Sequence, residues 1–328
     1  MTRNALLAAD CGSGVGLGHL ERMLALADAL YPDLDVSLIL PKGDRPLLRR
    51  VADRSFTTIE ALGSSAERVA AVVDAAPLVD VVVLDGYVFD VELQRTLRAR
   101  APLVVVDDLR MPANCDLGVN PSPCGGSMRP TGADAFLGGA PYALISGSFL
   151  QAREIVSRSG RRQRTVLIST GATDLDGIGV RVTDDLLEMD TTLRVTRVVG
   201  PDSHGAIGDH RPRERQLVAP ASLAHVFTEA TIYVGAAGTT AVQAACVGVP
   251  AVITAAVPNQ EAQAAALAAA GCALVVDAGD LAATCLRLLN DESRCEDMAS
   301  RGRALIDGHG ASRVAEAVRA LFGARVPR

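Results

Sequence analysis

The feature that most constrains the fold is a regular alternation of short apolar runs with helical patterns. In the first part of the chain, each apolar run of four or five residues is followed by a segment with helically spaced apolar residues. Such alternation is typical of β-α-β units, in which right-handed crossovers place helices on both faces of a parallel sheet. The runs are Ala5–Ala9, Val36–Leu40, Val81–Leu84 and Leu103–Val106, and the helical patterns cover 19–31, 44–53, 65–76 and 90–100.

A second set of the same kind begins after residue 164. A polar stretch rich in Arg and Ser over 151–164 precedes it and is interpreted as an interdomain linker. The segment from Pro201 to Pro220 is also polar, and we expect a long loop there. The strands of the second set are expected at Val166–Ser169, Leu193–Val199, Thr231–Val234, Ala251–Ile253 and Ala273–Val276.

The two sets predict two domains. A chain of 328 residues is long for one domain and comfortable for two. The predicted fold class is α/β, with two doubly wound Rossmann-like domains that face a cleft. The expected boundaries are 1–150 for the N-terminal domain, 151–164 for the linker and 165–310 for the C-terminal domain, followed by a helix within 311–328 that packs back on the N-terminal domain.

The composition excludes some functions. Aromatic residues make up 3% of the chain and Trp is absent, so the core is aliphatic, as in parallel sheets covered by helices. A net charge of −6 and the lack of a long basic run argue against nucleic acid as a partner, because phosphate neutralisation needs a basic face. An acidic chain can still hold a diphosphate on helix N-termini.

Cysteine usage and hydropathy indicate the compartment. The seven cysteines are odd in number and form no Cys-x-x-Cys pair, which favours free thiols over disulfides or a zinc site. The five-residue apolar run near the start is too short for a signal peptide, and no apolar stretch reaches the ~18 residues of a membrane span. We therefore expect a cytoplasmic protein without a metal or a membrane span. We also expect no cofactor, and either a monomer or a homodimer.

A glycine-rich loop follows the first strand and leads into the first helix, where α/β sheets bind ligands. Its sequence, Cys11-Gly-Ser-Gly-Val-Gly-Leu-Gly-His19, does not fit the dinucleotide fingerprint Gly-x-Gly-x-x-Gly. The second strand also ends in Leu40-Pro41-Lys42, without the acid that would hold a ribose. The sequence therefore argues against a Rossmann dinucleotide site.

His19 is the first candidate for chemistry, because it stands at the start of the helix beside this flexible loop. A neutral His in that position can act as a general base, or it can simply cap the helix or fill a gap, and the residues alone leave these two readings even. Cys11 is a weaker candidate nucleophile, because the sequence places no second His to serve it. Asp107-Asp108 lacks a nearby His or Glu, so a structural role at a strand end is favoured over a metal site.

Around His19 the chain resembles a known enzyme family. Gly16-x-Gly18-His19-x-x-Arg22 resembles a motif of the UDP-2,4-diacetamido-2,4,6-trideoxy-β-L-altropyranose hydrolases of pseudaminic acid biosynthesis. These hydrolases are related in fold to the GT-B glycosyltransferases, especially the N-acetylglucosaminyltransferase that forms lipid II. Further segments resemble the family in order and spacing: Asp85-Gly86-Tyr87, Val105-Val106-Asp107-Asp108-Leu109, Gly171-Ala-Thr-Asp174, Gly235-Ala-Ala-Gly-Thr-Thr240, Gly248-Val-Pro250 and Asn259-Gln260.

The resemblance implies roles for individual residues. It makes His19 the general base that activates water, and places Tyr87 and Asn259 near the sugar and the attacking water. The loop Gly238-Thr239-Thr240 is implied to hold the diphosphate on a helix N-terminus, a role that small residues also favour on physical grounds, although an ordinary strand-to-helix turn is the alternative. The remaining implied substrate contacts are Gly16, Gly18, Arg22, Asp85, Gly171, Asp174, Gln243 and Gln260.

The sequence departs from the family at several of these positions. Gln243 replaces a Glu that accepts the ribose hydroxyls in related transferases, Ala172 replaces a Gly, and Ser146 replaces an Arg. We therefore carry three readings. The first is a nucleotide-sugar hydrolase that releases a nucleoside diphosphate, UDP by the resemblance. The second is a GT-B glycosyltransferase that uses the same donor site, and the third is an inactive sugar-nucleotide binding protein.

Overall fold

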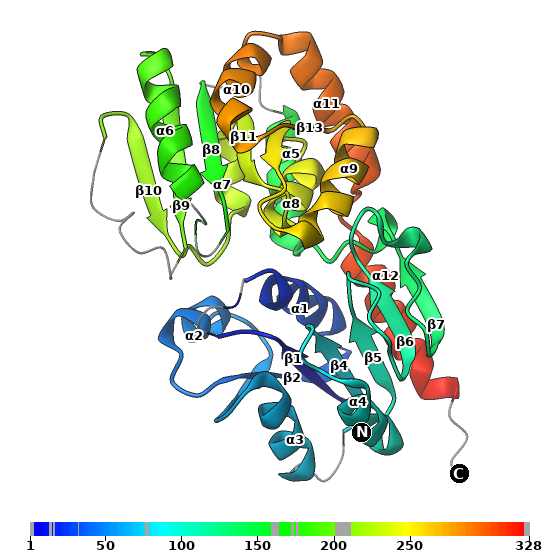
Figure 1. The fold of residues 1–328 in the computed structure, drawn as a ribbon. Helices are drawn as coiled ribbons and strands as arrows, with labels where there is room; N and C mark the ends of the chain where they lie inside the picture. Colours follow the sequence, from blue (N-terminus) through cyan, green and yellow to red (C-terminus); the bar gives the residue numbers. More distant parts are fainter. Residues whose placement is uncertain are drawn as a thin grey trace. The chain divides into compact units, whose positions relative to one another are not determined.

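The computed structural model divides the chain into two compact units, each built on its own parallel sheet (Figure 1). The first unit comprises Met1–Ser146 together with Gly308–Arg328, and the second comprises Gly147–Asp307. The structure describes residues 3–12, 15, 17–31, 33–75, 79–158, 164–171, 174, 177–200 and 211–324.

The sheet of the first unit has seven strands in the order β3-β2-β1-β4-β5-β6-β7, all parallel. The strand order reverses between β1 and β4, so the loops that follow these two strands leave toward opposite faces and open a place for a ligand. The strands are β1 (Arg3–Ala9), β2 (Leu34–Pro41), β3 (Thr57–Ala61), β4 (Val81–Asp85), β5 (Leu103–Val106), β6 (Cys115–Asn120) and β7 (Ala133–Gly138).

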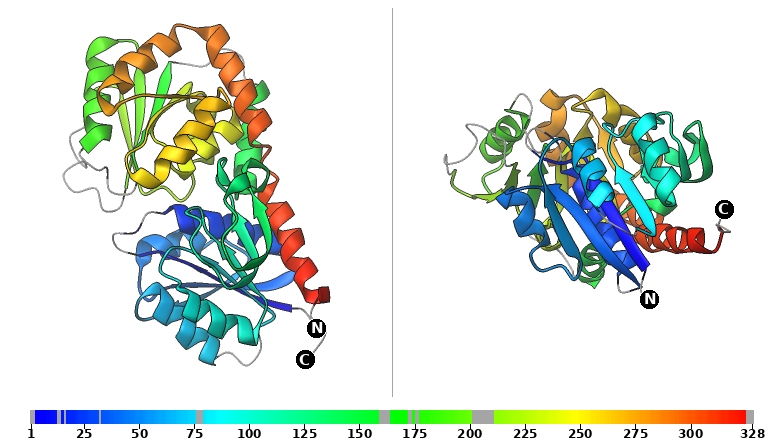
Figure 2. Two further views of the ribbon diagram at one scale, coloured as in Figure 1. Left: turned by 45° about the vertical axis from the view of Figure 1, so that its right-hand side comes forward. Right: turned by 90° about the horizontal axis from the view of Figure 1, so that it is seen from below.

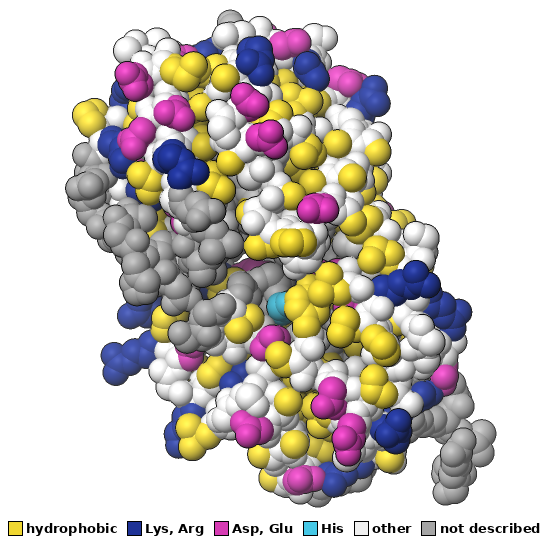
Figure 3. Space-filling view, viewed as in Figure 1, with side chains coloured by type: hydrophobic (Ala, Val, Ile, Leu, Met, Phe, Trp, Pro, Cys, Tyr) yellow, Lys and Arg dark blue, Asp and Glu magenta, His cyan; other side chains and the backbone are white. Residues whose placement is uncertain are grey.

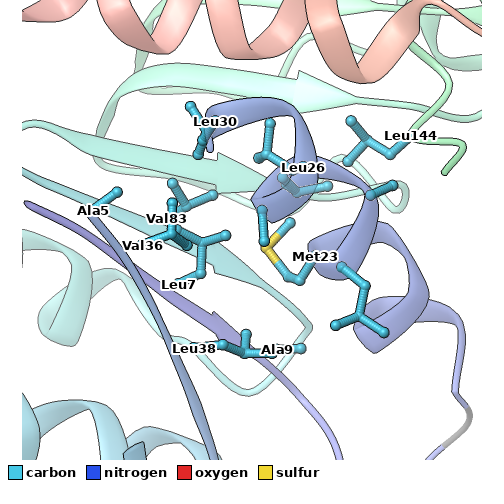
Figure 4. Close-up of a cluster of buried hydrophobic side chains, with 14 of the residues drawn as sticks. Ala5, Leu7, Ala9, Met23, Leu26, Leu30, Val36, Leu38, Val83 and Leu144 are labelled. Atoms are coloured by element: carbon cyan, nitrogen blue, oxygen red, sulfur yellow. The ribbon is translucent and has the colours of Figure 1, made fainter. Parts of the chain in front are cut away.

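Helices cover both faces of this sheet. On one face, Met23 and Leu26 of α1 pack on Leu7 and Val83 of the central strands (Figure 4). The other face is covered by α3 and α4, whose buried residues pack on the alternate side chains of the same strands. The helices are α1 (Gly18–Leu30), α2 (Arg45–Val51), α3 (Ser65–Ala75), α4 (Val91–Arg100) and α12 (Gly310–Ala324), with short 3-10 turns η1 (Gly125–Ser127) and η2 (Ala140–Tyr142).

The last helix belongs to the first unit although it follows the second in the chain. Helix α12 packs against α1, with Val314 and Val318 in the same apolar cluster as the central strands (Figure 2). It begins at Gly310, where a Cβ would lie 2.2 Å from the carbonyl oxygen of Ala143. A glycine at this point therefore lets the helix start close against η2.

The second unit repeats the plan with six parallel strands in the order β10-β9-β8-β11-β12-β13, and its order reverses between β8 and β11. Its strands are β8 (Thr165–Ser169), β9 (Arg194–Val199), β10 (Glu214–Val218), β11 (Ile232–Ala236), β12 (Ala251–Thr254) and β13 (Ala273–Val275). Its helices are α5 (Gly147–Arg158), α6 (Ile178–Met189), α7 (Ala224–Glu229), α8 (Thr239–Val247), α9 (Glu261–Ala269), α10 (Leu281–Leu289) and α11 (Glu292–Leu305), with 3-10 turns η4 (Pro258–Gln260) and η5 (Ala278–Asp280).

Two sequence expectations are corrected by this unit. Residues 151–158 are not a linker but the greater part of α5, which buries Phe149, Ala152 and Val156 and packs against α7 and α8. Residues 159–163 of that segment lie outside the described residues. The polar segment from Pro201 to Pro220 is not a loop throughout, because Glu214–Val218 forms the edge strand β10, while 201–210 lie outside the described residues.

All seven cysteines are free. Among the helices that the structure describes, none combines the length and apolarity needed to cross a membrane.

Candidate functional site

Two residues far apart in sequence meet at the point where the first sheet reverses its strand order. His19 stands in the first turn of α1, and Asp85 is the last residue of β4. Their elements follow from local sequence: α1 carries the apolar stripe that packs on the sheet, and Val81–Leu84 is a buried strand that ends at the Asp. The carboxyl ends of β1 and β4 therefore place the imidazole beside the carboxylate.

The His19 side chain is held through Nδ1. This nitrogen lies 2.7 Å from Oδ1 of Asp85, whose side chain is fully buried. Arg22, one turn further along α1, donates from Nε to Oδ2 of Asp85 over 2.8 Å and from Nη2 to Oδ1 over 2.6 Å. Nη2 also lies 2.7 Å from Nδ1 of His19. The guanidinium of Arg22 thus binds the Asp85 carboxylate in a bidentate way, which is the strong geometry for an Arg–carboxylate pair.

Two further residues close the arrangement into a ring. Arg22 donates from Nη1 to Oδ2 of Asp108 over 2.6 Å, and the Tyr87 hydroxyl donates to Oδ1 of the same carboxylate. The Tyr87 ring then packs edge-on against the His19 imidazole, with ring centroids 4.8 Å apart. We call His19, Arg22, Asp85, Tyr87 and Asp108 the His19 network.

The charges of the network stabilise each other. Burial works to lower the pKa of Arg22, but Asp85 and Asp108 raise it, so the guanidinium stays charged. Burial works to raise the pKa of Asp108, but Arg22, the Tyr87 hydroxyl and His19 together lower it. One positively charged guanidinium therefore faces two negatively charged carboxylates. The net charge of the network becomes zero when the imidazole takes a proton.

This arrangement fits the imidazole for proton transfer. Nδ1 donates to Asp85 in the tautomer that carries its proton there, and accepts from Nη2 of Arg22 in the other tautomer. The first tautomer leaves a lone pair on Nε2. Within the described part of the chain, Nε2 has no hydrogen-bond partner. A ring held at one nitrogen by a buried carboxylate, with the other nitrogen available, is the geometry of a general base.

The expectation that Arg22 and Asp85 contact substrate is corrected by their burial. Arg22 is 8% exposed, Asp85 is 0% exposed, and every charged atom of the pair is already engaged within the network. Both residues instead contact the His19 imidazole. Gly18 is the first residue of α1, whereas Gly16 lies outside the described residues.

Asp107 and Cys11 flank the network and have structural tasks. The two carboxylate oxygens of Asp107 accept the backbone N–H groups of Leu109 over 2.9 Å and Met111 over 2.6 Å, which closes the turn after β5. Burial raises the pKa of the Cys11 thiol to about 11, so the thiolate needed by a nucleophile is scarce at neutral pH. The sequence predicted a structural role at a strand end for Asp108 as well. The structure instead places the Asp108 carboxylate in the His19 network.

In the second unit, the N-terminus of α8 lies at the point of strand reversal beside β8. Gly238 precedes the helix without any side-chain cap, and the half-buried hydroxyls of Thr239 and Thr240 have no hydrogen-bond partner among the described residues. Uncapped N–H groups and the positive end of the helix dipole favour an anion. This loop can therefore hold a phosphate.

Gln243 lies one turn into the same helix and is 6% exposed. Its side-chain amide makes no hydrogen bond to any residue that the structure describes. Gln260 approaches from η4, where its Oε1 accepts the N–H of Ala256 over 3.0 Å and its Nε2 lies 3.6 Å from the position of a Cβ on Gly238. Asn259 is exposed beside it, so Asn259, Gln260 and the α8 N-terminus belong to one region of the unit.

Gly171 and Asp174 follow β8 on the other side of the strand reversal. Gly171 has a φ of +103°, and Asp174 has a φ of +45°, a backbone conformation that costs energy in a residue with a side chain. One oxygen of Asp174 accepts the Thr170 hydroxyl over 2.5 Å and the Gly179 N–H over 2.8 Å, which ties this loop to the start of α6. Asp174 therefore links the residue after β8 to the first turn of α6.

On the face drawn in Figure 3, Lys and Arg side chains are interspersed with Asp and Glu, and no broad basic patch gathers there.

No protein-family model matches the chain. An uncharacterized protein of Methanocaldococcus jannaschii, MJ1062, is 21% identical over 199 residues, which make up 57% of this chain and 40% of that protein. The chain thus matches well under two thirds of its relative's length.

Solved structures, glycosyltransferases among them, resemble the chain over almost its whole length. The glycosyltransferase of kitacinnamycin matches with a TM-score of 0.70 at 13% identity, covering 97% of this chain and 98% of that one. MurG of Acinetobacter baumannii has a TM-score of 0.64 at 16% identity, with 97% and 99% covered. CalG4, the calicheamicin glycosyltransferase, has a TM-score of 0.66 at 16% identity, with 100% of both chains covered. At such low identity these likenesses establish the fold alone, which is that of the GT-B glycosyltransferases with two Rossmann-like domains.

Proposed function

We propose that the chain is an enzyme that acts on a nucleotide sugar, and that it transfers the sugar to water. The observation that carries this proposal is the His19 network. Three motifs that resemble the hydrolase family separately in sequence, Gly18-His19-x-x-Arg22, Asp85-Gly86-Tyr87 and Asp107-Asp108-Leu109, converge on a single imidazole. Unrelated structural motifs have no reason to meet in this way, so their convergence supports a shared catalytic task.

In the proposed reaction, Nε2 of His19 takes a proton from a water molecule as the water oxygen attacks the anomeric carbon. The new carbon–oxygen bond forms as the bond to the diphosphate oxygen breaks, which inverts the anomeric centre. Asp85 pairs with the imidazolium that results. The leaving nucleoside diphosphate carries away the bonding electrons, and the uncapped N-terminus of α8 is suited to stabilise its charge.

A glycosyltransferase is the second candidate, and the likeness to solved glycosyltransferases favours it. In that reaction His19 takes the proton from an acceptor hydroxyl instead of water, and every other step is the same. The two candidates share the donor and the base, so they differ only in the nucleophile.

The deciding experiment follows product formation from a panel of UDP-, dTDP-, GDP- and CDP-sugars in water enriched in ¹⁸O, without acceptor. A hydrolase that attacks carbon releases nucleoside diphosphate together with a free sugar that carries ¹⁸O at the anomeric position. Label in the diphosphate instead would mean attack at phosphorus and would contradict the mechanism. Turnover that requires an added alcohol would establish the transferase.

A His19→Ala variant serves as the control for both reactions, because it removes the base and leaves the α8 region untouched. Binding of nucleotide by the unmodified protein, with no turnover on any sugar with or without acceptor, would support an inactive binding protein.

Seven free cysteines fit a reducing compartment, so we propose that the reaction takes place in the cytoplasm.

A further inference from the structure

Asp108 links helix α1 to the loop after β4 through the two oxygens of one carboxylate. Its Oδ2 accepts from Arg22 on α1, and its Oδ1 accepts from Tyr87 in the loop after β4. Its side chain is 23% exposed, so the cost of burying the charge is only partly compensated by water. A carboxylate that serves merely to end a strand needs neither partner, and the neighbouring Asp107 already closes that turn.

We propose that Asp108 is a positioning residue for the base: through Arg22 and Tyr87 it fixes the His19 imidazole and supplies the negative charge that its protonated form requires. This inference rests on the proposed function of His19 as a general base. It assigns to Asp108 and Tyr87 a joint task on the enzyme, in place of the contact with the sugar that the resemblance implies for Tyr87.

The first half of the task is geometric. Asp85 holds the imidazole only at Nδ1, about which the ring can still swing. The Tyr87 ring stands at 85° to the imidazole plane with centroids 4.8 Å apart, and so restricts this movement from the side. Asp108 accepts the hydrogen bond of the Tyr87 hydroxyl and so helps to fix the position of this ring.

The second half is electrostatic. Asp85 and Arg22 alone form a neutral pair, so an imidazolium beside them has no net charge to pair with. Asp108 adds one negative charge, and the network becomes neutral when His19 is protonated. Asp107 is a further ionisable group beside the network: burial raises the pKa of its carboxyl, the N–H groups of Leu109 and Met111 lower it, Asp108 raises it and Arg22 lowers it.

The charge can be tested without any substrate. Protein labelled with ¹⁵N at histidine reports the protonation of His19 through its imidazole signals, which the His19→Ala variant identifies. In Asp108→Asn we expect the midpoint of the His19 titration to lie at lower pH than in the unmodified protein, because a negative charge that interacts with the imidazole is lost. Asp134→Asn is the matched control: it removes a carboxylate near the start of β7, at the opposite end of the strands, and leaves the midpoint in place.

An unchanged midpoint in a folded Asp108→Asn protein overturns the electrostatic half. Tyr87→Phe keeps the ring and every charge but removes the hydroxyl, so it tests the geometric half even if the Asp108 variant fails to fold. We expect Tyr87→Phe to lower kcat about tenfold with KM changed less than twofold. The double variant should be no slower than the slower single variant, because both act through one contact.

Losses of kcat that multiply in the double variant overturn the joint task. A loss confined to KM in Tyr87→Phe overturns it as well, because that result would mean contact with the substrate. If the midpoint shifts as expected while the unmodified protein turns over no nucleotide sugar, the proposed function fails and the positioning by Asp108 stands. The two failures are therefore distinguishable.

Discussion

The imidazole of His19 and the carboxylate of Asp85 lie 2.7 Å apart, although 66 positions separate them in the chain. The contact depends on the parallel arrangement of β1 and β4, whose register pairs Ala9 with Asp85 itself. It also depends on Gly86, where a Cβ would lie 2.4 Å from the Cβ of Asp10. The backbone thus approaches the loop after β1 more closely than any other residue would allow, and brings the acid to the base.

Removal of the base should slow turnover strongly without unfolding the protein. We expect His19→Ala to lower kcat by roughly 10²–10⁴-fold, the range in which general bases contribute. His225→Ala is the control, because that side chain is 84% exposed on α7. Both variants should melt within a few degrees of the unmodified protein. Unchanged turnover in His19→Ala would mean that another group takes the proton.

Asp85 should matter to folding as well as to catalysis. Asp85→Ala leaves the buried guanidinium of Arg22 with one carboxylate, Asp108, among the described residues, and losing one member of a buried ion pair costs on the order of 3–5 kcal/mol. Asp74→Ala removes a carboxylate that is 67% exposed and pairs with Arg100, and should change stability by less than about 1 kcal/mol. Urea unfolding of the unmodified protein, Asp85→Ala and Asp74→Ala measures the change in the free energy of unfolding for each variant. Equal stabilities would show that the network does not hold the first unit together.

Much of the fold could be predicted from sequence because buried parallel strands are apolar on both faces. The predicted runs Val81–Leu84 and Ala251–Ile253 fall within β4 and β12. The edge strand β10 was missed because it lacks such an apolar run. An edge strand needs less apolar surface, and Glu214 within β10 pairs with Arg197 of β9. Helix α5 was missed because its charged residues resemble a linker, although it buries three apolar ones.

The site was only partly predictable. His19 stands out locally, by its place at the junction of a loop and a helix. The task of Arg22 does not, because its partners Asp85 and Asp108 lie 63 and 86 positions away and only the strand order brings them together. One signal was available: two acids that end neighbouring strands meet at the same sheet edge, where an Arg three residues after His19 faces the same side.

Alkaline pH should destabilise the fold before it ionises the buried thiols. Burial raises the pKa of Cys11 and of Cys246 from 9.0 to about 11, so both stay protonated in the folded state at a pH where the unfolded chain has lost these protons. The unfolded state is then favoured progressively between pH 9 and 11. We expect the contribution of these two thiols to the free energy of unfolding to be level below pH 9 and to fall above it. Cys246→Ala should show a shallower fall, and an equal slope would contradict the assignment.

A negative charge at the start of α8 should separate folding from ligand binding. Thr239→Glu places a carboxylate at the positive end of the helix, which stabilises a helix by about 0.3–1 kcal/mol. The same charge repels a diphosphate, so we expect the Kd for UDP to rise at least tenfold, which corresponds to ~1.4 kcal/mol. Thr239→Gln has a similar size without the charge and is the control. Calorimetry measures binding, and an unchanged Kd in Thr239→Glu would place the diphosphate elsewhere.

Gln243 should determine how strongly the protein prefers a nucleotide with a ribose 2′-hydroxyl over one without it. Its buried amide offers one carbonyl oxygen as an acceptor, whereas the Glu of related transferases offers two charged ones. In Gln243→Glu we expect the preference for UDP over 2′-deoxy-UDP to rise about tenfold, since a hydrogen bond to a charged group contributes ~1.5–3 kcal/mol. The variant should also be less stable without ligand, because a carboxylate is then buried unpaired. Gln243→Ala removes both acceptor and donor, and should bind the two nucleotides about equally. Calorimetric Kd values for both nucleotides give the ratio, and an equal ratio in Gln243→Glu and the unmodified protein would exclude position 243 from contact with the ribose.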